Sequence, residues 1–353
     1  MVNYIFRALP LKRDARTQRY SELLDGNTVF NTWEERYESN KSIEKLKRGR
    51  SENSKIISYP LYLIYLFLFS LLRIRKSDRV ICMELDTFIP IFLGSFWKNS
   101  LIYLDVVDPV GQAKFRKVPF NKFFDYIEYL FLRCRKLNIL PNENRLEYYK
   151  DRLNVNIDKC KYLLVENVPM LNNIGHIKQS AVKFDIGYFG TLDESRGIKE
   201  LIEYASALDI SLLIAGIGPM EDFILQKSSE IGESKLKFYG SFSIAEIEKL
   251  YSMVNFSWAY YTDRTMLHKY ASPNKYYEHL AFKTPMIMNQ FVPLSNRLAL
   301  RNTGVVIGDQ LDKKNFIILN DKITEFNHGE SDFSEWESRY NEYCVDFNVY
   351  ERS

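Results

Sequence analysis

Several residue types that build common functional sites are scarce in this sequence. The chain has 353 residues and only four cysteines, and no two of them have the CxxC spacing of a zinc site. So few cysteines argue against a disulfide scaffold and suit a reducing compartment. The four histidines form no HxH or HExxH pattern, which argues against a histidine-built metal centre.

Long hydrophobic runs are nearly absent as well. The apolar run at the N-terminus is too short for a signal peptide, and Arg7 interrupts it. One longer run, residues 56–72, is at the lower limit for a membrane span and contains Pro60. We expect a buried helix over 59–74 in an α/β domain, and a helix that touches or crosses a membrane is the alternative.

What the chain does have is the composition of a globular protein. Apolar residues make up 46% and charged residues 26%, which excludes a disordered or fibrous chain. The length suits two domains. Charge is divided unevenly: residues 1–180 hold 30 Lys and Arg against 20 Asp and Glu, and residues 181–353 hold 18 against 25. The basic half could meet anionic lipid headgroups or a phosphorylated acceptor, or simply be solvated, and no motif supports nucleic-acid binding.

Strand and helix patterns alternate along both halves of the chain. A stretch with Asn and Pro, residues 163–175, separates the halves and is the predicted linker. The expected strands are 2–6, 79–83, 101–106, 137–140, 184–189, 211–215, 236–239, 256–259 and 284–288. This series predicts two α/β domains with parallel sheets, residues 1–168 and 169–330. A helix with an aromatic stripe is expected within 331–353, and we expect it to pack back toward the first domain.

The segment SPNKYYEHLAFKTPMIM holds the strongest candidate binding site. Ser272 is a favoured N-cap and Pro273 a favoured first helical residue, so the helix would present free N–H groups at Asn274 and Lys275. With the helix dipole and the ammonium group, this end suits a diphosphate. Glu278, one turn further on, could accept both hydroxyl protons of a ribose. The alternative is a capped helix with a surface ion pair.

A second candidate is the loop after the strand at 184–189. The strand ends at Gly190, and the loop carries Arg196 before a helix that Gly197 opens. Arginine suits phosphate because its planar guanidinium makes two parallel hydrogen bonds. The alternative is an ordinary loop with a solvated arginine. The following AGIGP motif lacks the third glycine of the dinucleotide fingerprint and predicts a tight turn.

These segments together resemble the donor-binding half of the GT-B glycosyltransferases, of the kind grouped in family 4. The resemblance is carried, in order, by FDIGYFGTL-x4-RGIKELI, LLIAGIGP, LKFYGSF, EIEKLYSMVNFSWAYY and SPNKYYEHLAFKTPMIM. It implies two Rossmann-like domains facing each other across a cleft. It also implies transfer of a sugar, from a donor such as a UDP-sugar, to a hydroxyl of a glycan or lipid-linked glycan in cell-surface polysaccharide, capsule or lipopolysaccharide synthesis.

The resemblance also assigns roles to residues of the second domain. Arg196 and Lys275 would contact the donor diphosphate, and Glu278 would bind the ribose. The other donor-binding candidates are Gly190, Thr191, Gly240, Ser241, Phe242, Ser272 and Asn274. No metal and no other cofactor is expected, because fixed cations stabilise the leaving diphosphate in this fold.

The chain departs from the family pattern at three places. The first of two glutamates spaced eight apart is replaced by Tyr270, and the arginine that often follows the loop glycine is replaced by Thr191. Paired glycines are missing from the first loop. Arg13 or Arg16 could take over a phosphate role there, or the loop could serve only the acceptor.

The catalytic group is expected where the strand at 101–106 ends. Asp105 and Asp108 lie there, and parallel sheets place ligands at the carboxyl ends of their strands. Either carboxylate could act as a general base or orient the acceptor hydroxyl. The alternative is that Asp108 and Pro109 only form a turn. Retention and inversion of the anomeric configuration both stay open.

The sequence therefore predicts a glycosyltransferase of the hexosyltransferase class that adds one sugar to a growing glycan. We expect it in the cytoplasm, and peripheral attachment to the inner face of the cytoplasmic membrane through its basic first domain is the alternative. Two other functions stay open. One is an inactive GT-B subunit that binds a glycan or a partner, which Tyr270 favours. The other is a GT-B nucleotide-sugar epimerase, which four scattered histidines disfavour.

Overall fold

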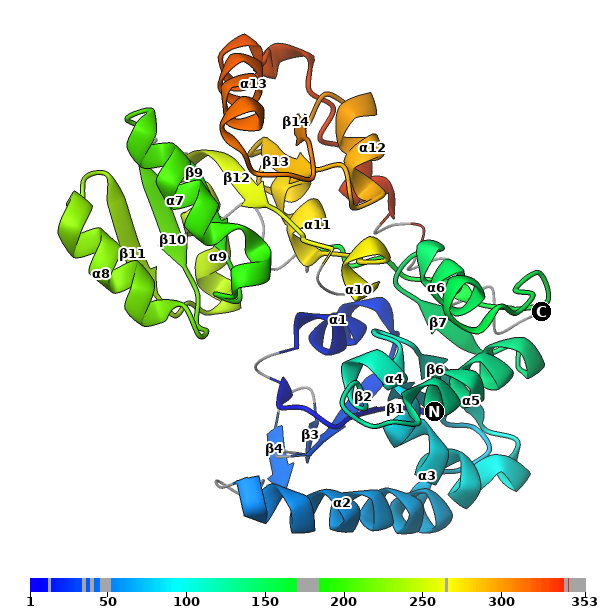
Figure 1. Cartoon of the computed structure of the whole chain (residues 1–353). Helices are drawn as coiled ribbons and strands as arrows, with labels where there is room; N and C mark the ends of the chain where they lie inside the picture. The colour runs from blue at the N-terminus through cyan, green and yellow to red at the C-terminus, as the bar shows by residue number, and fades with distance from the viewer. Residues whose placement is uncertain are drawn as a thin grey trace. The chain divides into compact units, whose positions relative to one another are not determined.

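A computed structural model describes most of the chain and divides it into two compact units (Figure 1). The first unit comprises Met1–Glu166 with Asn341–Ser353, and the second comprises Asn167–Tyr340. The described residues are 1–11, 14–33, 36–38, 41–44, 52–169, 184–263, 266–339 and 342. Residues 163–169 of the predicted linker are described and 170–175 are not, and most of the predicted C-terminal helix lies outside the described residues. Of the aromatic stripe only Trp336 is described, and it is buried.

The first unit is built on a sheet of eight strands, six of them parallel. Its strands are β1 (Val2–Arg7), β2 (Asn27–Thr32), β3 (Arg36–Glu38), β4 (Lys41–Glu44), β5 (Arg79–Met83), β6 (Leu101–Asp105), β7 (Asn138–Leu140) and β8 (Leu163–Leu164). Their order is β4-β3-β2-β1-β5-β6-β7-β8, and β3 and β4 run antiparallel. Every residue of β5 is buried, as expected for a strand covered on both faces. The four strands predicted in this half are present.

Helices connect these strands and cover the sheet. They are α1 (Ala15–Leu23), α2 (Glu52–Arg73), α3 (Leu85–Ser95), α4 (Val110–Ala113), α5 (Asn121–Cys134) and α6 (Asn144–Leu153), and α3 continues into a 3₁₀ turn, η2 (Phe96–Lys98). Asp14 begins α1 by accepting a hydrogen bond from the backbone N–H of Thr17. The long helix α2 packs along α3.

Helix α2 corrects one expectation. The predicted helix is present, but only one of its faces is buried, through Tyr62, Leu66 and Phe69. The opposite face, from Leu61 to Leu72, exposes large apolar side chains. The apolar run indicated a buried helix because composition does not report which neighbours cover each face. Within the residues that the structure describes, no helix is long and apolar enough to cross a membrane.

The second unit is a sheet of six parallel strands. They are β9 (Phe184–Phe189), β10 (Leu212–Ala215), β11 (Leu236–Gly240), β12 (Val254–Ala259), β13 (Met286–Asn289) and β14 (Gly304–Ile307). Their order is β11-β10-β9-β12-β13-β14. The helices are α7 (Ile198–Ala207), α8 (Glu221–Ile231), α9 (Ile247–Tyr251), α10 (Met266–Lys269), α11 (Asn274–Ala281), α12 (Leu294–Leu300) and α13 (Lys313–Glu325), and a 3₁₀ turn, η4 (Glu194–Arg196), precedes α7. The predicted βαβα series is confirmed.

Each sheet reverses its winding direction at one point. In the first unit β1 lies between β2 and β5, and in the second unit β9 lies between β10 and β12. The loops that leave the two strands at such a point go to opposite faces of the sheet and open a crevice at the carboxyl ends. The fold therefore predicts ligand sites at the carboxyl ends of β1 and β5 and at the carboxyl ends of β9 and β12.

Candidate functional site

Two cations meet at the carboxyl ends of β9 and β12. The Nζ atom of Lys275, in the first turn of α11, lies 3.5 Å from the ring centroid of Tyr188 on β9. The same atom lies 3.5 Å from the backbone oxygen of Trp258 on β12. The guanidinium carbon of Arg196 lies 4.6 Å from the ring centroid of Tyr261, which follows β12. Each cation thus faces a tyrosine ring, an attraction that holds a positive charge without neutralising it.

The loop that carries Arg196 is fixed by its backbone. Gly197 has a φ of 63°, a left-handed conformation that lets the chain turn into α7 and that favours glycine. The indole nitrogen of Trp258 donates a hydrogen bond of 3.0 Å to the backbone oxygen of Arg196. Asp193 accepts a hydrogen bond from the N–H of Ser195, which starts the turn. Local structure therefore holds the base of the Arg196 side chain in place.

Helix α11 begins one residue later than predicted. Pro273, not Ser272, is its N-cap, because the backbone becomes helical only at Asn274. Ser272 is buried, and its backbone oxygen accepts a hydrogen bond of 2.6 Å from the side chain of Asn167. The side chain of Pro273 makes no capping hydrogen bond to the first turn. Its positive end, beside the exposed Asn274, is therefore available to an anion.

The surroundings of Lys275 favour the neutral form of its side chain. Burial of the ammonium group, and then the positive charge of Arg196, lower the pKa of Lys275 well below its ordinary value. Glu278 acts in the opposite direction. A bound anion would offset the repulsion between Lys275 and Arg196 and favour the charged form of the lysine. The pair is therefore suited to a ligand with two negative charges close together.

Glu278 completes this cluster from the next turn of α11. Its carboxylate accepts a hydrogen bond of 3.1 Å from the hydroxyl group of Tyr251, which is buried. Its charge acts on both Lys275 and Tyr261. The structure thus brings together Arg196, Lys275 and Glu278, the three side chains that the sequence predicts to converge.

The other predicted donor-binding residues lie along the same edge of the sheet. A Cβ atom at Gly190 would lie 3.3 Å from the side chain of Lys275, and one at Gly216 would lie 1.7 Å from the backbone oxygen of Gly190. The N–H of Gly216 donates to the backbone oxygen of Gly240 over 2.8 Å, which ties the ends of β10 and β11 together. Thr191 and Ser241 are exposed here, and Phe242 is half-buried.

In the first unit, Asp105 does not have the position expected of a general base. It is fully buried, and its oxygens accept hydrogen bonds of 2.9 and 2.7 Å from Arg16 and of 2.6 Å from the hydroxyl group of Tyr20. Arg16 also donates to the backbone oxygen of Val165 over 2.7 Å. This burial and pairing indicate a structural role for Asp105 and Arg16. Arg13 lies outside the described residues.

Asp108 remains the candidate catalytic carboxylate. Its side chain is 47% exposed, and one oxygen lies 3.2 Å from a guanidinium nitrogen of the buried Arg145. Pro109, which follows it, is the N-cap of the short helix α4. The turn therefore holds an accessible carboxylate beside the end of β6.

The structure shows a further buried carboxylate at the carboxyl edge of the first sheet, Glu84, which we did not predict from the sequence. It follows β5 with a φ of 71°, an uncommon conformation for a residue other than glycine. It is buried, with its oxygens 2.8 Å from Arg7 and 2.6 Å from Lys114, which also contacts Asp86. Burial alone would raise the pKa of Glu84, but Arg7 and Lys114 hold it below its ordinary value. The signal was available, because Glu84 directly follows the apolar strand RVICM.

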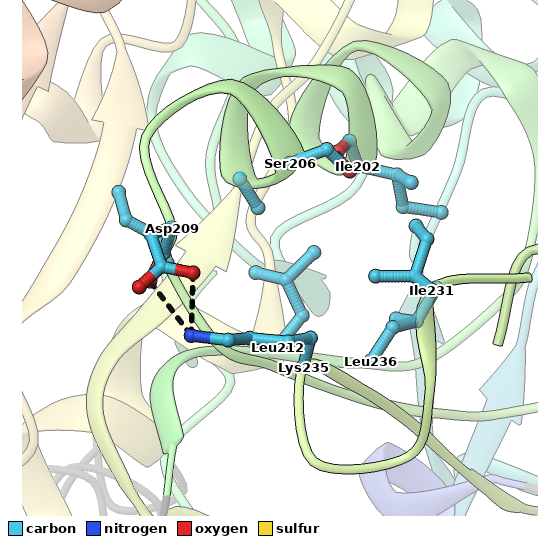
Figure 2. A pocket seen from close by; sticks show the side chains of 9 residues that line it. Ile202, Ser206, Asp209, Leu212, Ile231, Lys235 and Leu236 are labelled. Carbon is cyan, nitrogen blue, oxygen red and sulfur yellow. Dashed lines mark hydrogen bonds and ion pairs between the residues drawn. The ribbon is translucent and has the colours of Figure 1, made fainter.

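A pocket in the second unit lies away from this cluster. It is at the amino ends of β10 and β11, has a volume of about 130 Å³, and has mostly aliphatic walls (Figure 2). An ion pair of 2.6 Å between Lys235 and Asp209 closes one side. Among the described residues there is also no group of three or more His, Cys, Asp or Glu side chains that could hold a metal ion.

Comparison with solved structures identifies proteins that share the fold of this chain. No family model matches the chain, and no curated protein matches it. Sucrose-phosphate synthase from Thermosynechococcus elongatus matches with a TM-score of 0.71 at 11% identity, over 99% of this chain and 98% of that chain. WaaG, a glycosyltransferase involved in lipopolysaccharide biosynthesis, matches with a TM-score of 0.61 at 10% identity, over 98% and 95%. A UDP-forming trehalose-phosphate synthase from Burkholderia vietnamiensis matches with a TM-score of 0.61 at 10% identity, over 100% and 97%.

These likenesses cover nearly the whole of both chains in each case. The chain has the two-domain, Rossmann-like GT-B fold, and the predicted fold class is confirmed. Sequence identities this low are evidence for the fold alone. The chemistry of the site must therefore be argued from the residues of this chain.

Proposed function

We propose that this protein is a glycosyltransferase that moves a sugar from a nucleotide-sugar donor to an acceptor hydroxyl. One observation carries the proposal. Arg196 and Lys275 lie together, over tyrosine rings, at the switch point between β9 and β12, with Glu278 one turn further along α11. A nucleoside diphosphate has two phosphates for the cations and a ribose for the carboxylate.

The chemistry follows from where charge develops. When the bond between the anomeric carbon and the diphosphate breaks, negative charge grows on the leaving phosphate. Arg196, Lys275 and the positive end of α11 would stabilise that charge, which is the largest single contribution in many enzymes. Asp108 would accept the acceptor's proton or orient its hydroxyl group. Two carboxylates of the first unit, Asp105 and Glu84, would support the loops around it.

The finer parts of the proposal rest on the sequence resemblance and on the ligands and roles of similar solved structures. We propose a family 4-like enzyme of the hexosyltransferase class that uses a UDP-sugar without a metal. One similar structure, from E. coli, is described as bound with UDP-2-fluoro glucose, and WaaG is described as involved in lipopolysaccharide biosynthesis. The proposed acceptor is a glycan or lipid-linked glycan of a cell-surface polysaccharide, at the inner face of the cytoplasmic membrane.

A thermal-shift panel of nucleotide sugars, followed by calorimetry, tests the proposal. We expect UDP-sugars to raise the melting temperature, and Glu278→Ala to weaken the best ligand by about tenfold or more while the fold stays intact. Glu203→Gln, an exposed carboxylate on α7, is the control and should bind like wild type. Unchanged affinity in Glu278→Ala for every ligand that binds would refute the site.

A second candidate is an inactive GT-B subunit, and Tyr270 favours it. Tyr270 stands where the family often has the glutamate that contacts the sugar; here it is buried, with the Lys269 ammonium 5.1 Å from its ring centroid. Slow hydrolysis of the bound nucleotide sugar by the purified protein would support the enzyme. Donor binding without hydrolysis or transfer would support the subunit.

A further inference from the structure

The outer layer of the first unit has an unusual apolar surface. Helix α2 exposes the large apolar side chains Leu61, Ile64, Phe67, Leu68, Leu71 and Leu72. These positions fall on one face of the helix, and Leu72 is 76% exposed. A surface helix normally exposes its polar face to water, whereas α2 exposes an apolar face.

The same surface continues onto α3. A Cβ atom at Gly94 of α3 would lie 1.8 Å from the side chain of Ser70 and 2.7 Å from the backbone oxygen of Phe67, so the two helices nearly touch there. Next to this contact α3 and η2 expose Leu93, Phe96 and Trp97. Figure 1 shows the two helices side by side. Lys98 then donates hydrogen bonds to the backbone oxygens of Ser70 and Leu71 in α2 and of Ile74 just after it, which fixes η2 at the end of that helix.

Helix α5 extends the surface on the other side of α3. The ring of Phe131 on α5 lies 5.0 Å from that of Phe88 and 6.0 Å from that of Phe92, both on α3. Outward from this contact α5 exposes Phe123, Tyr126 and Leu130, spaced three and four apart. We call the exposed apolar side chains of α2, α3, η2 and α5 the apolar face. Exposed apolar areas of this extent mark interaction sites on soluble proteins.

Within the segment that carries the apolar face, the exposed charges have one sign. Residues 58–136 contain seven acidic side chains, and none of them is exposed: five are buried, and Asp86 and Asp108 are half-buried. The exposed charged residues of this segment are all basic: Arg73, Arg75, Lys76, Arg116, Lys117, Lys122, Arg133 and Lys136. The face therefore suits an occupant that is apolar within and anionic at its surface.

We propose that the apolar face docks on an anionic lipid bilayer, with the aliphatic and aromatic side chains in the interfacial layer and the cations on the lipid headgroups. Leucine and phenylalanine provide the apolar contribution, Trp97 suits the headgroup level, and the basic rim adds attraction to anionic lipid. A second copy of the chain fits less well, because a two-fold contact would bring two identical basic rims together. The inference specifies the membrane part of the proposed function but needs no assumption about the transfer reaction.

Flotation of the full-length protein with vesicles tests the proposal. We expect binding to vesicles of phosphatidylethanolamine and phosphatidylglycerol, weaker binding at high salt, and little binding to phosphatidylcholine alone. The double variant Leu68→Glu, Leu72→Glu should weaken binding by about tenfold or more, since it places charge within the apolar layer. The matched control is Leu300→Glu on α12 of the second unit, where the leucine is 86% exposed; it should bind like wild type.

Tryptophan fluorescence gives an independent readout. Of the four tryptophans, Trp97 is 50% exposed, whereas Trp33, Trp258 and Trp336 are buried. Anionic vesicles with brominated acyl chains should therefore quench the wild-type emission, and Trp97→Phe should abolish the quenching. Absence of flotation and quenching at low salt would overturn the proposal, as would a concentration-dependent dimer that Leu68→Glu, Leu72→Glu dissolves. Calorimetry with UDP on the same samples tests the proposed donor site separately, because Arg196, Lys275 and Glu278 belong to the second unit.

Discussion

The two units share a fold but prepare their carboxyl edges in opposite ways. In the first unit three cations at the edge, among the described residues, pair with buried carboxylates: Arg16 with Asp105, and Arg7 and Lys114 with Glu84. In the second unit Arg196 and Lys275 face tyrosine rings. Buried ion pairs fix loops, whereas cations held by aromatic rings stay available to a ligand. The comparison therefore indicates that the carboxyl edge of the second sheet, and not that of the first, is suited to binding an anion.

The largest expected effect tests the structural side of this comparison. Asp105→Asn leaves the guanidinium group of Arg16 buried without its counter-charge, and should lower the free energy of unfolding by about 3–5 kcal/mol. Urea denaturation followed by circular dichroism measures this. Asp209→Asn, where an 86% exposed carboxylate pairs with the exposed Lys235, is the control and should change stability by less than about 1 kcal/mol. Equal small losses in both variants would remove the structural role of Asp105.

The next effect concerns turnover. Asp108→Asn removes the accessible carboxylate of the first unit and should lower kcat by about 100-fold, with donor affinity unchanged, if the group assists proton transfer from the acceptor. Steady-state assays with varied acceptor, after the donor is identified, measure it. Wild-type kcat would remove Asp108 from the mechanism and shift attention to Glu84.

A smaller effect tests the ligand side of the comparison. Lys275→Met and Arg196→Met should each weaken UDP binding by about 10- to 100-fold, because each removes a charge-assisted contact to phosphate. Neither should lower the melting temperature of the free protein, since no buried carboxylate loses its partner. Lys199→Met, an exposed lysine on α7, is the control. A large loss of stability in Lys275→Met would mean that this edge, too, is structural.

The smallest effect is on pH dependence. The pKa of Lys275 is lowered in the free protein by burial and by Arg196, and a bound diphosphate should raise it again. Between these two values binding requires proton uptake, so UDP affinity should fall by about tenfold per pH unit as pH rises. Calorimetry in buffers of different ionisation enthalpy counts the protons. The same slope in Lys275→Met would assign the proton to another group.

Sequence patterns predicted the second unit better than the first, for physical reasons. The strand β9 has the predicted bounds, because FDIGYF is an apolar run ended by glycine. The strand β2 was missed, because its polar residues are stabilised by distant partners, such as the hydrogen bond of 2.9 Å from Asn31 to Tyr65. The partner of Asp105 could not be predicted for the same reason: Arg16, which pairs with it, lies 89 residues away in the chain. The local pattern around Lys275 was informative because Pro273, Lys275 and Glu278 lie at the start of one helix, so their spacing alone predicts their place there.

The central claim is that the second unit holds a nucleoside diphosphate between Arg196 and Lys275. Crystals soaked with UDP test it most directly. The account predicts the diphosphate in contact with both cations at the start of α11, and the ribose hydroxyls on Glu278. It also predicts that both cations turn from the rings of Tyr188 and Tyr261 toward the phosphates. UDP bound elsewhere, with the two cations still over their rings, would contradict it.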